Sequence, residues 1–451
     1  MKLAEFIHPD LNVARSINIE RDYRNEDVIR DYHITAKTLE IIKRFIEAIL
    51  GEKVTSWSLT GPYGMGKSAF VNFLLALTRS RNEKETANAL HKLEQSDIKL
   101  YQKFVQALNN RTDNEGFLQV AVTAAYEPVN NTLARGLLDA LNQSTIPNRD
   151  VLVEDLLSLL KQKIVDSQKL MKAFSNTVEN AQRPMIIIVD EFGKNLDYMA
   201  HHPERGDIFI VQQLAESKMI YLWVCLHQAF DEYVSGLSTV QRQEWSKVQG
   251  RFEDISFVES DQQMLYLIKK ALKHEDIAYE RIEKWAYQVK NFIEETDLFF
   301  NKDDFDVDTI RDLYPLHPIT AVALIELCRR YAQNDRTLLS FLCSGDKYAL
   351  PAYLEATKID KAGDLPAVGL DYLYNYFFNI TSTTFINRAE SQRWLEIQSK
   401  IEEYEYAGPY DQALLKSIGI LNLLQGSLAI RASKEVASGI VGSSLGVTPQ
   451  L

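Results

Sequence analysis

The chain has few cysteines and no excess of positive charge, and both shortages exclude classes of protein. Its 451 residues include three cysteines, Cys225, Cys328 and Cys343, too few and too scattered for a disulfide framework or a zinc site. We expect them to be reduced core residues. A formal net charge of -12 argues against a generally basic protein that coats nucleic acid, so any DNA contact must be local.

Long hydrophobic runs are missing as well. No apolar stretch approaches the length of a membrane span, and residues 1–6 lack the apolar segment of a signal peptide. We therefore expect a cytoplasmic protein that does not contact a membrane. What the chain does have is 46% hydrophobic residues, enough to supply cores for about three ordinary domains.

One segment fills every fixed position of the P-loop pattern G-x-x-x-x-G-K-[ST]. It runs Gly61, Pro62, Tyr63, Gly64, Met65, Gly66, Lys67, Ser68, and Ala69 follows it. In this pattern the backbone N–H groups face the phosphates of a nucleoside triphosphate, the lysine contacts the β- and γ-phosphates, and the serine is a Mg²⁺ ligand. A glycine-rich turn that binds no nucleotide is the alternative. The strand pattern before the loop and the helical pattern after it favour the nucleotide site.

The rest of the pattern alternates between strands and helices, which is typical of a parallel sheet covered by helices on both faces. Five strands are predicted, at residues 56–60, 117–123, 185–191, 219–226 and 254–258. Helices are expected at 38–50 and from 131 to 180, and the charged stretch 78–115 is interpreted as a solvated helical insertion. The sequence therefore predicts an α/β fold with a five-stranded parallel P-loop sheet, followed from residue 261 by a helical lid and a mostly helical tail.

Two carboxylates close the strand at 185–191. Ligands of open α/β sheets bind at the carboxyl ends of the strands, where Asp190 is positioned to hold Mg²⁺ and Glu191 to polarise the attacking water. The alternative is a pair of solvated acids that cap a strand.

Three further residues are candidates for contact with the γ-phosphate. His227 follows the next strand and would sense the phosphate or orient water. Arg251 precedes the last strand and is a candidate arginine finger on the nucleotide of a neighbouring subunit, and Arg336 opens a helix of the lid. Their alternative roles are a capping polar residue, a surface ion pair and an ordinary helix-terminal arginine, respectively.

The order of these signals resembles that of AAA+ ATPases, in the branch that includes Orc1/Cdc6-like initiators. Residues 189–196, 206–216, 244–252 and 314–318 are similar to segments of the large ATPases of bacterial anti-phage defence, of the bacteriophage-exclusion type. The resemblance implies ATP with Mg²⁺, a homo-oligomer completed by a trans arginine, other defence-system proteins as partners, and DNA as a candidate ligand.

The resemblance also implies a domain order. We expect an AAA+ nucleotide-binding domain at 1–260, with a helical lead-in at 1–50 and the insertion at 78–115, then a helical lid at 261–350 and a helical domain at 351–451. Residues 411–424 resemble the first helix of a winged-helix domain, but no wing pattern follows before Leu451. We therefore expect either a fragment of a longer protein or a short natural form. For the fold of this region, a three-helix packing domain is the alternative to a winged helix.

Three functions are consistent with these patterns. The first is an ATPase that couples nucleotide state to the assembly or nucleic-acid engagement of a defence complex. The second is a nucleotide-gated signalling switch with slow turnover, and the third is an Orc1/Cdc6-like DNA-loading scaffold.

Overall fold

The computed structural model divides into two compact units. The sheet unit comprises Ile17–Val258, and the helical unit combines Met1–Ser16 with Glu259–Leu451. Residues 1–16 are expected from the sequence in the nucleotide-binding domain, whereas their contacts group them with the helical unit. The predicted boundary between lid and tail at residue 350, within the helical unit, stays a prediction.

The structure describes residues 2–10, 17–51, 55–62, 66–203, 208–233, 237–257, 261–275, 279–296, 305–331, 338–359, 365–381, 388–404, 406–425 and 433–445.

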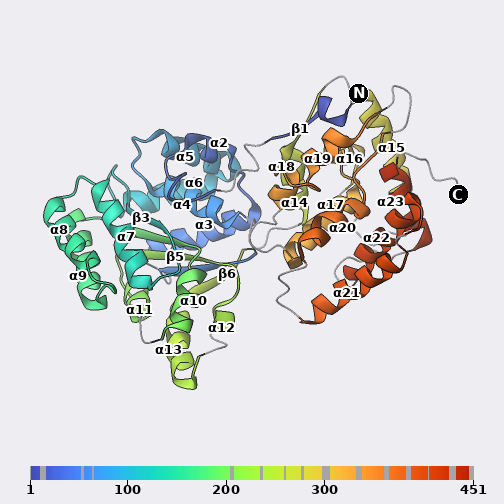
Figure 1. The fold of residues 1–451 in the computed structure, drawn as a ribbon. Coiled ribbons are helices and arrows are strands. Elements are labelled where there is room, and N and C mark those ends of the chain that lie inside the picture. The colour runs from blue at the N-terminus through green and yellow to red at the C-terminus, as the bar shows by residue number, and fades with distance from the viewer. Residues whose placement is uncertain are drawn as a thin grey trace. The chain divides into compact units, whose positions relative to one another are not determined.

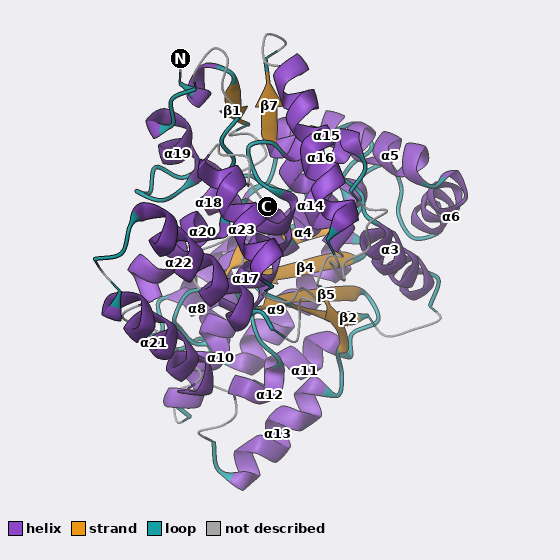
Figure 2. Cartoon of the chain, turned by 90° about the vertical axis from the view of Figure 1, so that its right-hand side faces the viewer, coloured by secondary structure: helices purple, strands orange, loops and turns teal. Residues whose placement is uncertain are grey.

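The sheet unit is built on five parallel strands in the order β3-β4-β5-β2-β6. Their bounds are β2 (Ser56–Thr60), β3 (Leu118–Thr123), β4 (Met185–Asp190), β5 (Ile220–Leu226) and β6 (Glu253–Ser256). Figure 2 shows β4, β5 and β2 as neighbouring orange arrows. The five predicted strands and the fold class are therefore confirmed.

The sheet is buried on both faces because successive side chains of a strand point to opposite sides. On β4, Ile186 and Ile188 belong to one hydrophobic core and Ile187 and Val189 to the other. The first core is closed by α3 (Ala36–Ile49), α4 (Lys67–Thr78), α5 (Lys84–Ser96) and α6 (Ile98–Asn109). The second is closed by α7 (Val129–Asn142), α8 (Arg149–Leu160), α9 (Ser167–Ala181), α10 (Gly193–His201), α11 (Phe209–Ala215), α12 (Phe230–Tyr233) and α13 (Thr239–Gln249). Figure 1 shows these helices around the sheet, together with α2 (Glu26–Asp31).

The stretch 78–115 is mostly helical, as predicted, but it is not solvated on all sides, and its status as an insertion stays a prediction. Leu93 of α5 and Phe104 of α6 are fully buried in the first core. Both helices are amphipathic, with charged residues on the outer face and few, widely spaced apolar residues inside. The high charge of the whole segment therefore conceals its buried stripe.

The helical unit begins with a feature that the sequence does not predict. Strand β1 (Ile7–Pro9) pairs antiparallel with β7 (Leu272–His274), which joins the start of the chain to a segment far along it. The other elements are η1 (Leu3–Glu5), α14 (Asp261–Ala271), α15 (Tyr279–Glu295), α16 (Val307–Leu313), α17 (Pro318–Tyr331), α18 (Leu338–Cys343), α19 (Leu350–Ala356), α20 (Leu370–Thr381), α21 (Arg388–Glu403), α22 (Pro409–Leu423) and α23 (Lys434–Leu445). The regular elements described after residue 365 are helices, so the expected helical tail is confirmed.

The core of the helical unit includes Tyr314, in one of the segments that carry the family resemblance. The Tyr314 ring lies edge-on to Trp285 at 4.8 Å between centroids, and its hydroxyl donates to the carbonyl of Pro366 at 2.9 Å. His317 nearby in sequence is fully buried, and this burial lowers its pKa to about 3. This segment therefore has a packing role in the structure.

The cysteines are free thiols: Cys225 and Cys328 are buried and Cys343 is half-buried. Among the described helices, none is both long enough and apolar enough to span a bilayer.

Candidate nucleotide-binding site

The P-loop joins the end of β2 to the start of α4, as the sequence predicts. The Gly61 N–H donates to the carbonyl of Leu226 at 3.1 Å, and a Cβ at position 61 would lie 2.5 Å from the carbonyl oxygen of Phe257. Only glycine fits this close backbone approach without a shift. Gly66, just before α4, has a φ of 85°, a left-handed conformation that glycine adopts readily. Residues 63–65, also predicted to bind phosphate, lie outside the described part of the chain.

Lys67 is the first residue of α4, and its side chain is buried. Its Nζ donates to the carbonyl oxygens of Gly61 and Pro62, the latter at 2.7 Å. Burial lowers the pKa of Lys67 to about 8, and the negative charges of nearby Asp190 and Glu191 oppose this shift. The predicted phosphate-binding lysine and the predicted acidic pair therefore lie within electrostatic range of one another.

Asp190 ends β4 and is 4% exposed. Burial raises the pKa of its carboxyl group, whereas a hydrogen bond from the Ser68 hydroxyl and another from the Glu191 N–H, at 2.9 Å, act to lower it. The two residues predicted to bind Mg²⁺ thus lie close enough to interact. Their hard oxygen atoms are the ligand type that Mg²⁺ takes in nucleotide sites, where it also keeps waters and phosphate oxygens.

Glu191 has a φ of 54°, in the left-handed region that residues with a side chain rarely occupy. Strained conformations of this kind concentrate at functional sites. The Glu191 carboxylate is partly exposed and forms an ion pair with the ammonium of Lys194, one turn along in α10. No role is predicted for Lys194 from the sequence, because Glu191 lies before α10 in a left-handed conformation and the pair is not one between two residues of a regular helix.

His227 directly follows β5, as predicted. Burial lowers its pKa to about 3, with smaller contributions from the positive charges of Lys67 and Lys194. His227 is therefore neutral at pH 7, and both lysines lie close enough to affect it. A neutral imidazole is able to donate or accept a hydrogen bond at the phosphate, as the predicted sensor role requires.

The end of β5 holds the two predicted motifs together through its main chain. The carbonyl of Leu226 accepts from Gly61, and the carbonyl of Cys225 accepts from the Phe192 N–H at 3.0 Å. The Cys225 thiol lies close enough to Asp190 for the carboxylate to raise the thiol's pKa, in addition to the larger effect of burial. The sequence identifies Cys225 only as a core residue, because its proximity to Asp190 arises between strands and has no local signal.

Of the two predicted arginines, only Arg251 lies among the described residues. Arg251 follows α13, and its Nε lies 2.8 Å from the Glu216 carboxylate in an ion pair whose side chains are both about half exposed. This is the surface ion pair that the sequence leaves open as the alternative, and a role in a second subunit stays a prediction. Arg336 lies outside the described residues.

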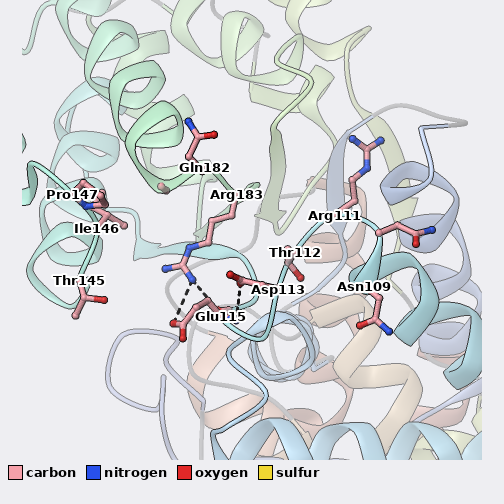
Figure 3. Close-up of a pocket in the computed structure, with 12 residues that line it drawn as sticks. Asn109, Arg111, Thr112, Asp113, Glu115, Thr145, Ile146, Pro147, Gln182 and Arg183 are labelled. Carbon is pink, nitrogen blue, oxygen red and sulfur yellow. Dashed lines mark hydrogen bonds and ion pairs between the residues drawn. The ribbon is translucent and has the colours of Figure 1, made fainter.

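A polar cavity of about 460 Å³ lies away from these residues, at the amino-terminal edge of the sheet (Figure 3). It is lined by segments that precede β3 and β4, including Glu115 and Arg183, which form an ion pair at 3.7 Å. The P-loop and the acids lie at the opposite ends of the strands. The cavity is therefore separate from the candidate nucleotide site.

Comparison with known proteins agrees with this assignment. Residues 36–198 match the KAP family P-loop domain, a range that contains both the P-loop and the acidic pair. The match covers less than half of the chain, which is thus similar to that domain over this range. No curated protein matches the chain.

Several solved structures resemble the chain weakly over most of its length. The Aeropyrum pernix ORC2 protein in its ADP form is 11% identical, with 94% of this chain and 99% of that chain covered and a TM-score of 0.35. Cdc6p from Pyrobaculum aerophilum is 11% identical, with 95% and 86% covered and a TM-score of 0.32. The Aeropyrum pernix ORC1 protein in complex with DNA is 14% identical, with 85% and 87% covered and a TM-score of 0.31. At such TM-scores nothing about the activity or partners of this chain follows from the likeness.

Proposed function

We propose that the protein is a Mg²⁺-dependent ATPase. The observation that carries the proposal is the placement of the Ser68 hydroxyl within interaction range of the buried Asp190 carboxylate, next to Lys67 and directly before Glu191. A P-loop that only turned the chain would not require a buried acid against its serine, because burying a carboxylate is costly without a partner or a ligand. ATP, rather than another nucleoside triphosphate, is proposed from the family resemblance.

Each residue then has a separate task. Lys67 contacts the β- and γ-phosphates, and Ser68 and Asp190 hold Mg²⁺, which neutralises phosphate charge when bound. Glu191 accepts a proton from water as the water oxygen bonds to the γ-phosphorus and the bond from that phosphorus to the β–γ bridging oxygen breaks, which yields ADP and phosphate. His227 contacts the γ-phosphate.

The larger role is proposed from the resemblance. ATP binding and hydrolysis would control the assembly of a cytoplasmic homo-oligomer, through Arg251 acting in trans and Arg336 from the lid, and its engagement with anti-phage defence proteins or DNA. The ion pair of Arg251 with Glu216 is compatible with this role, because exposed ion pairs contribute little and exchange partners at low cost.

A nucleotide-gated switch with slow turnover is the second candidate. The ion pair between Glu191 and Lys194 favours it, because the ammonium occupies the carboxylate that would otherwise contact the attacking water. The two candidates differ in turnover rate and share the same site.

The test uses two variants with ATP and Mg²⁺. Lys67→Ala should lower ATP affinity by roughly 100-fold or more, and Glu191→Gln should retain binding while the steady-state release of phosphate falls by about 10²–10⁴-fold. Light scattering of the Glu191→Gln variant, with and without DNA, measures assembly at the same time. Unchanged ATP binding by Lys67→Ala contradicts the proposed site, and a wild-type turnover already as slow as that of Glu191→Gln favours the switch.

A further inference from the structure

Lys194 is a second lysine at the nucleotide site, and no P-loop pattern includes it. Its Nζ forms an ion pair with the Glu191 carboxylate, and its backbone N–H donates to the Glu191 carbonyl at 3.0 Å. Its side chain is 48% exposed, so the ammonium is able to move while the backbone stays in place. The backbone of Lys194 is therefore held in place, while its ammonium group is able to move.

The next residue in the chain, Asn195, holds this part of the backbone in place. Asn195 is fully buried, and its amide donates to the carbonyl oxygens of Ala125 and Glu127 and to the Thr132 hydroxyl at 2.8–3.2 Å. These bonds tie the first turn of α10 to the segment that follows β3. Side-chain motion of Lys194 consequently does not require the helix to move.

The position of Lys194 is set by what lies around it. Glu191 is close enough to Lys67 to raise the pKa of that lysine, and it is ion-paired with Lys194, so both ammonium groups interact with one carboxylate. His227 is influenced by both lysines. Since Lys67 marks the β- and γ-phosphate position, these shared neighbours put Lys194 in the same part of the site.

We propose that Lys194 recognises the γ-phosphate by exchange. In this proposal, which rests on the proposed function, Lys194 is bound to Glu191 until a triphosphate enters and then moves to the γ-phosphate oxygens. A phosphate carries more negative charge than one carboxylate, so it is the stronger partner for the ammonium. The exchange frees the Glu191 carboxylate to act on water, so the acid becomes an effective base only when a γ-phosphate is present.

The ion pair of Lys194 differs from an ordinary one of the same spacing. Lys247 and Glu244 form an i, i+3 pair on α13 at 2.8 Å, with side chains 61% and 58% exposed. That pair involves neither a strained backbone nor a neighbouring P-loop lysine. Lys247→Ala is therefore a matched control for Lys194→Ala in the same unit.

The experiment measures dissociation constants of the full chain for AMP-PNP and for ADP, both with Mg²⁺, by isothermal titration calorimetry. Lys194→Ala should reduce the preference for AMP-PNP over ADP about tenfold, with ADP affinity unchanged, because the lost charge-assisted contact exists only with the γ-phosphate. Lys194→Arg should retain most of the preference, and Lys247→Ala all of it.

A double-mutant cycle tests the exchange itself. Glu191→Gln removes the competing carboxylate, so it should increase the preference for AMP-PNP, and adding Lys194→Ala should cancel that increase. An equal change for both nucleotides in Lys194→Ala would overturn the proposal, as would an increase from Glu191→Gln that persists without Lys194. Lys67→Ala tests the nucleotide site itself, independently of Lys194. If Lys67→Ala abolishes AMP-PNP binding and one of the two contrary results is also found, the proposed ATPase site still holds and only the role of Lys194 is rejected.

Discussion

The parallel sheet has an amino-terminal edge, where its strands begin, and a carboxyl edge, where they end. Charged side chains at these two edges differ in their exposure to water. At the amino-terminal edge, Arg183 pairs with Glu115, whose side chain is 59% exposed to water. At the carboxyl edge, Lys67 and Asp190 are 5% and 4% exposed and their pKa values are shifted by burial. One edge has an ordinary screened ion pair, and the other has ionisable groups held in a desolvated environment.

The features that mark a functional site lie at one edge of the sheet, and the polar cavity lies at the other. The cavity of about 460 Å³ lies at the amino-terminal edge (Figure 3), where the Arg183–Glu115 pair reaches solvent. Shifted pKa values, a strained Glu191 and a glycine-only backbone approach all occur at the carboxyl edge. Such features mark functional sites because they cost stability and are retained where they serve a purpose.

The largest effect is expected from Gly61→Ala at the carboxyl edge. The new Cβ would lie 2.5 Å from the Phe257 carbonyl oxygen, so the backbone must shift and the P-loop with it. We expect a loss of about 1–3 kcal/mol in the free energy of unfolding and loss of measurable ATP binding. Urea denaturation and calorimetry measure the two effects.

Gly345→Ala is the control for this substitution, because a Cβ at position 345 would meet no atom within 4 Å. It should leave both stability and ATP binding unchanged. Normal ATP affinity in Gly61→Ala would show that the loop tolerates displacement, and the contrast between the edges would then lose its geometric basis.

A moderate effect on stability is expected when the pH is lowered, because burial holds His227 in its neutral form. Its pKa is about 3 in the folded chain, against an ordinary value of 6.5 for histidine. Between these values the unfolded state binds more protons, so the stability contributed by the neutral imidazole is complete above pH 6.5 and decreases as the pH falls toward 3. His227→Gln should therefore lose less stability than the wild type between about pH 7 and pH 4.5, as measured by urea denaturation.

Binding of ATP gives a second test of the shifted pKa of His227. Bound ATP adds negative charge next to His227, so it should raise the pKa of His227 in an NMR titration. His317, which burial in the helical unit also holds near a pKa of 3, is the control and should not respond. An equal response of both histidines would mean that the shift of His227 does not report on the nucleotide site.

The smallest effect is expected from Arg183→Ala at the amino-terminal edge. The lost ion pair has a well-exposed partner, so the free energy of unfolding should fall by less than about 1 kcal/mol. ATP affinity and turnover should be unchanged within about twofold in a phosphate-release assay. A large loss of turnover would show that the two edges are coupled and that the cavity takes part in function.

Much of the site was predictable because its signals are local. The P-loop is a continuous motif, and the apolar run before Asp190 identifies a strand that must end at the ligand-binding edge. The proximity of Cys225 to Asp190 was not predictable, because it depends on which strands are neighbours. The ion pair of Lys194 with Glu191 depends on where α10 begins, and helix boundaries are poorly defined by sequence.

The fold shows the same division between local and distant information. The five strands of the sheet are short apolar runs and were visible in the sequence. Strands β1 and β7 are three residues each, and their pairing joins distant parts of the chain. No local pattern specifies so short and distant a pairing, and the buried stripes of α5 and α6 were likewise hidden by their surface charge.

The last two carbonyl groups of β5 have a consequence for how this protein tolerates mutation. They accept hydrogen bonds from Gly61 and Phe192, so the distance between the phosphate-binding loop and the acids is set by peptide groups that every residue type possesses. A substitution of Cys225 or Leu226 therefore leaves both acceptors in place, whereas the size of each fully buried side chain is constrained by the core around it. The spacing of the two halves of the site is thus a property of the backbone of this strand and not of any one of its side chains.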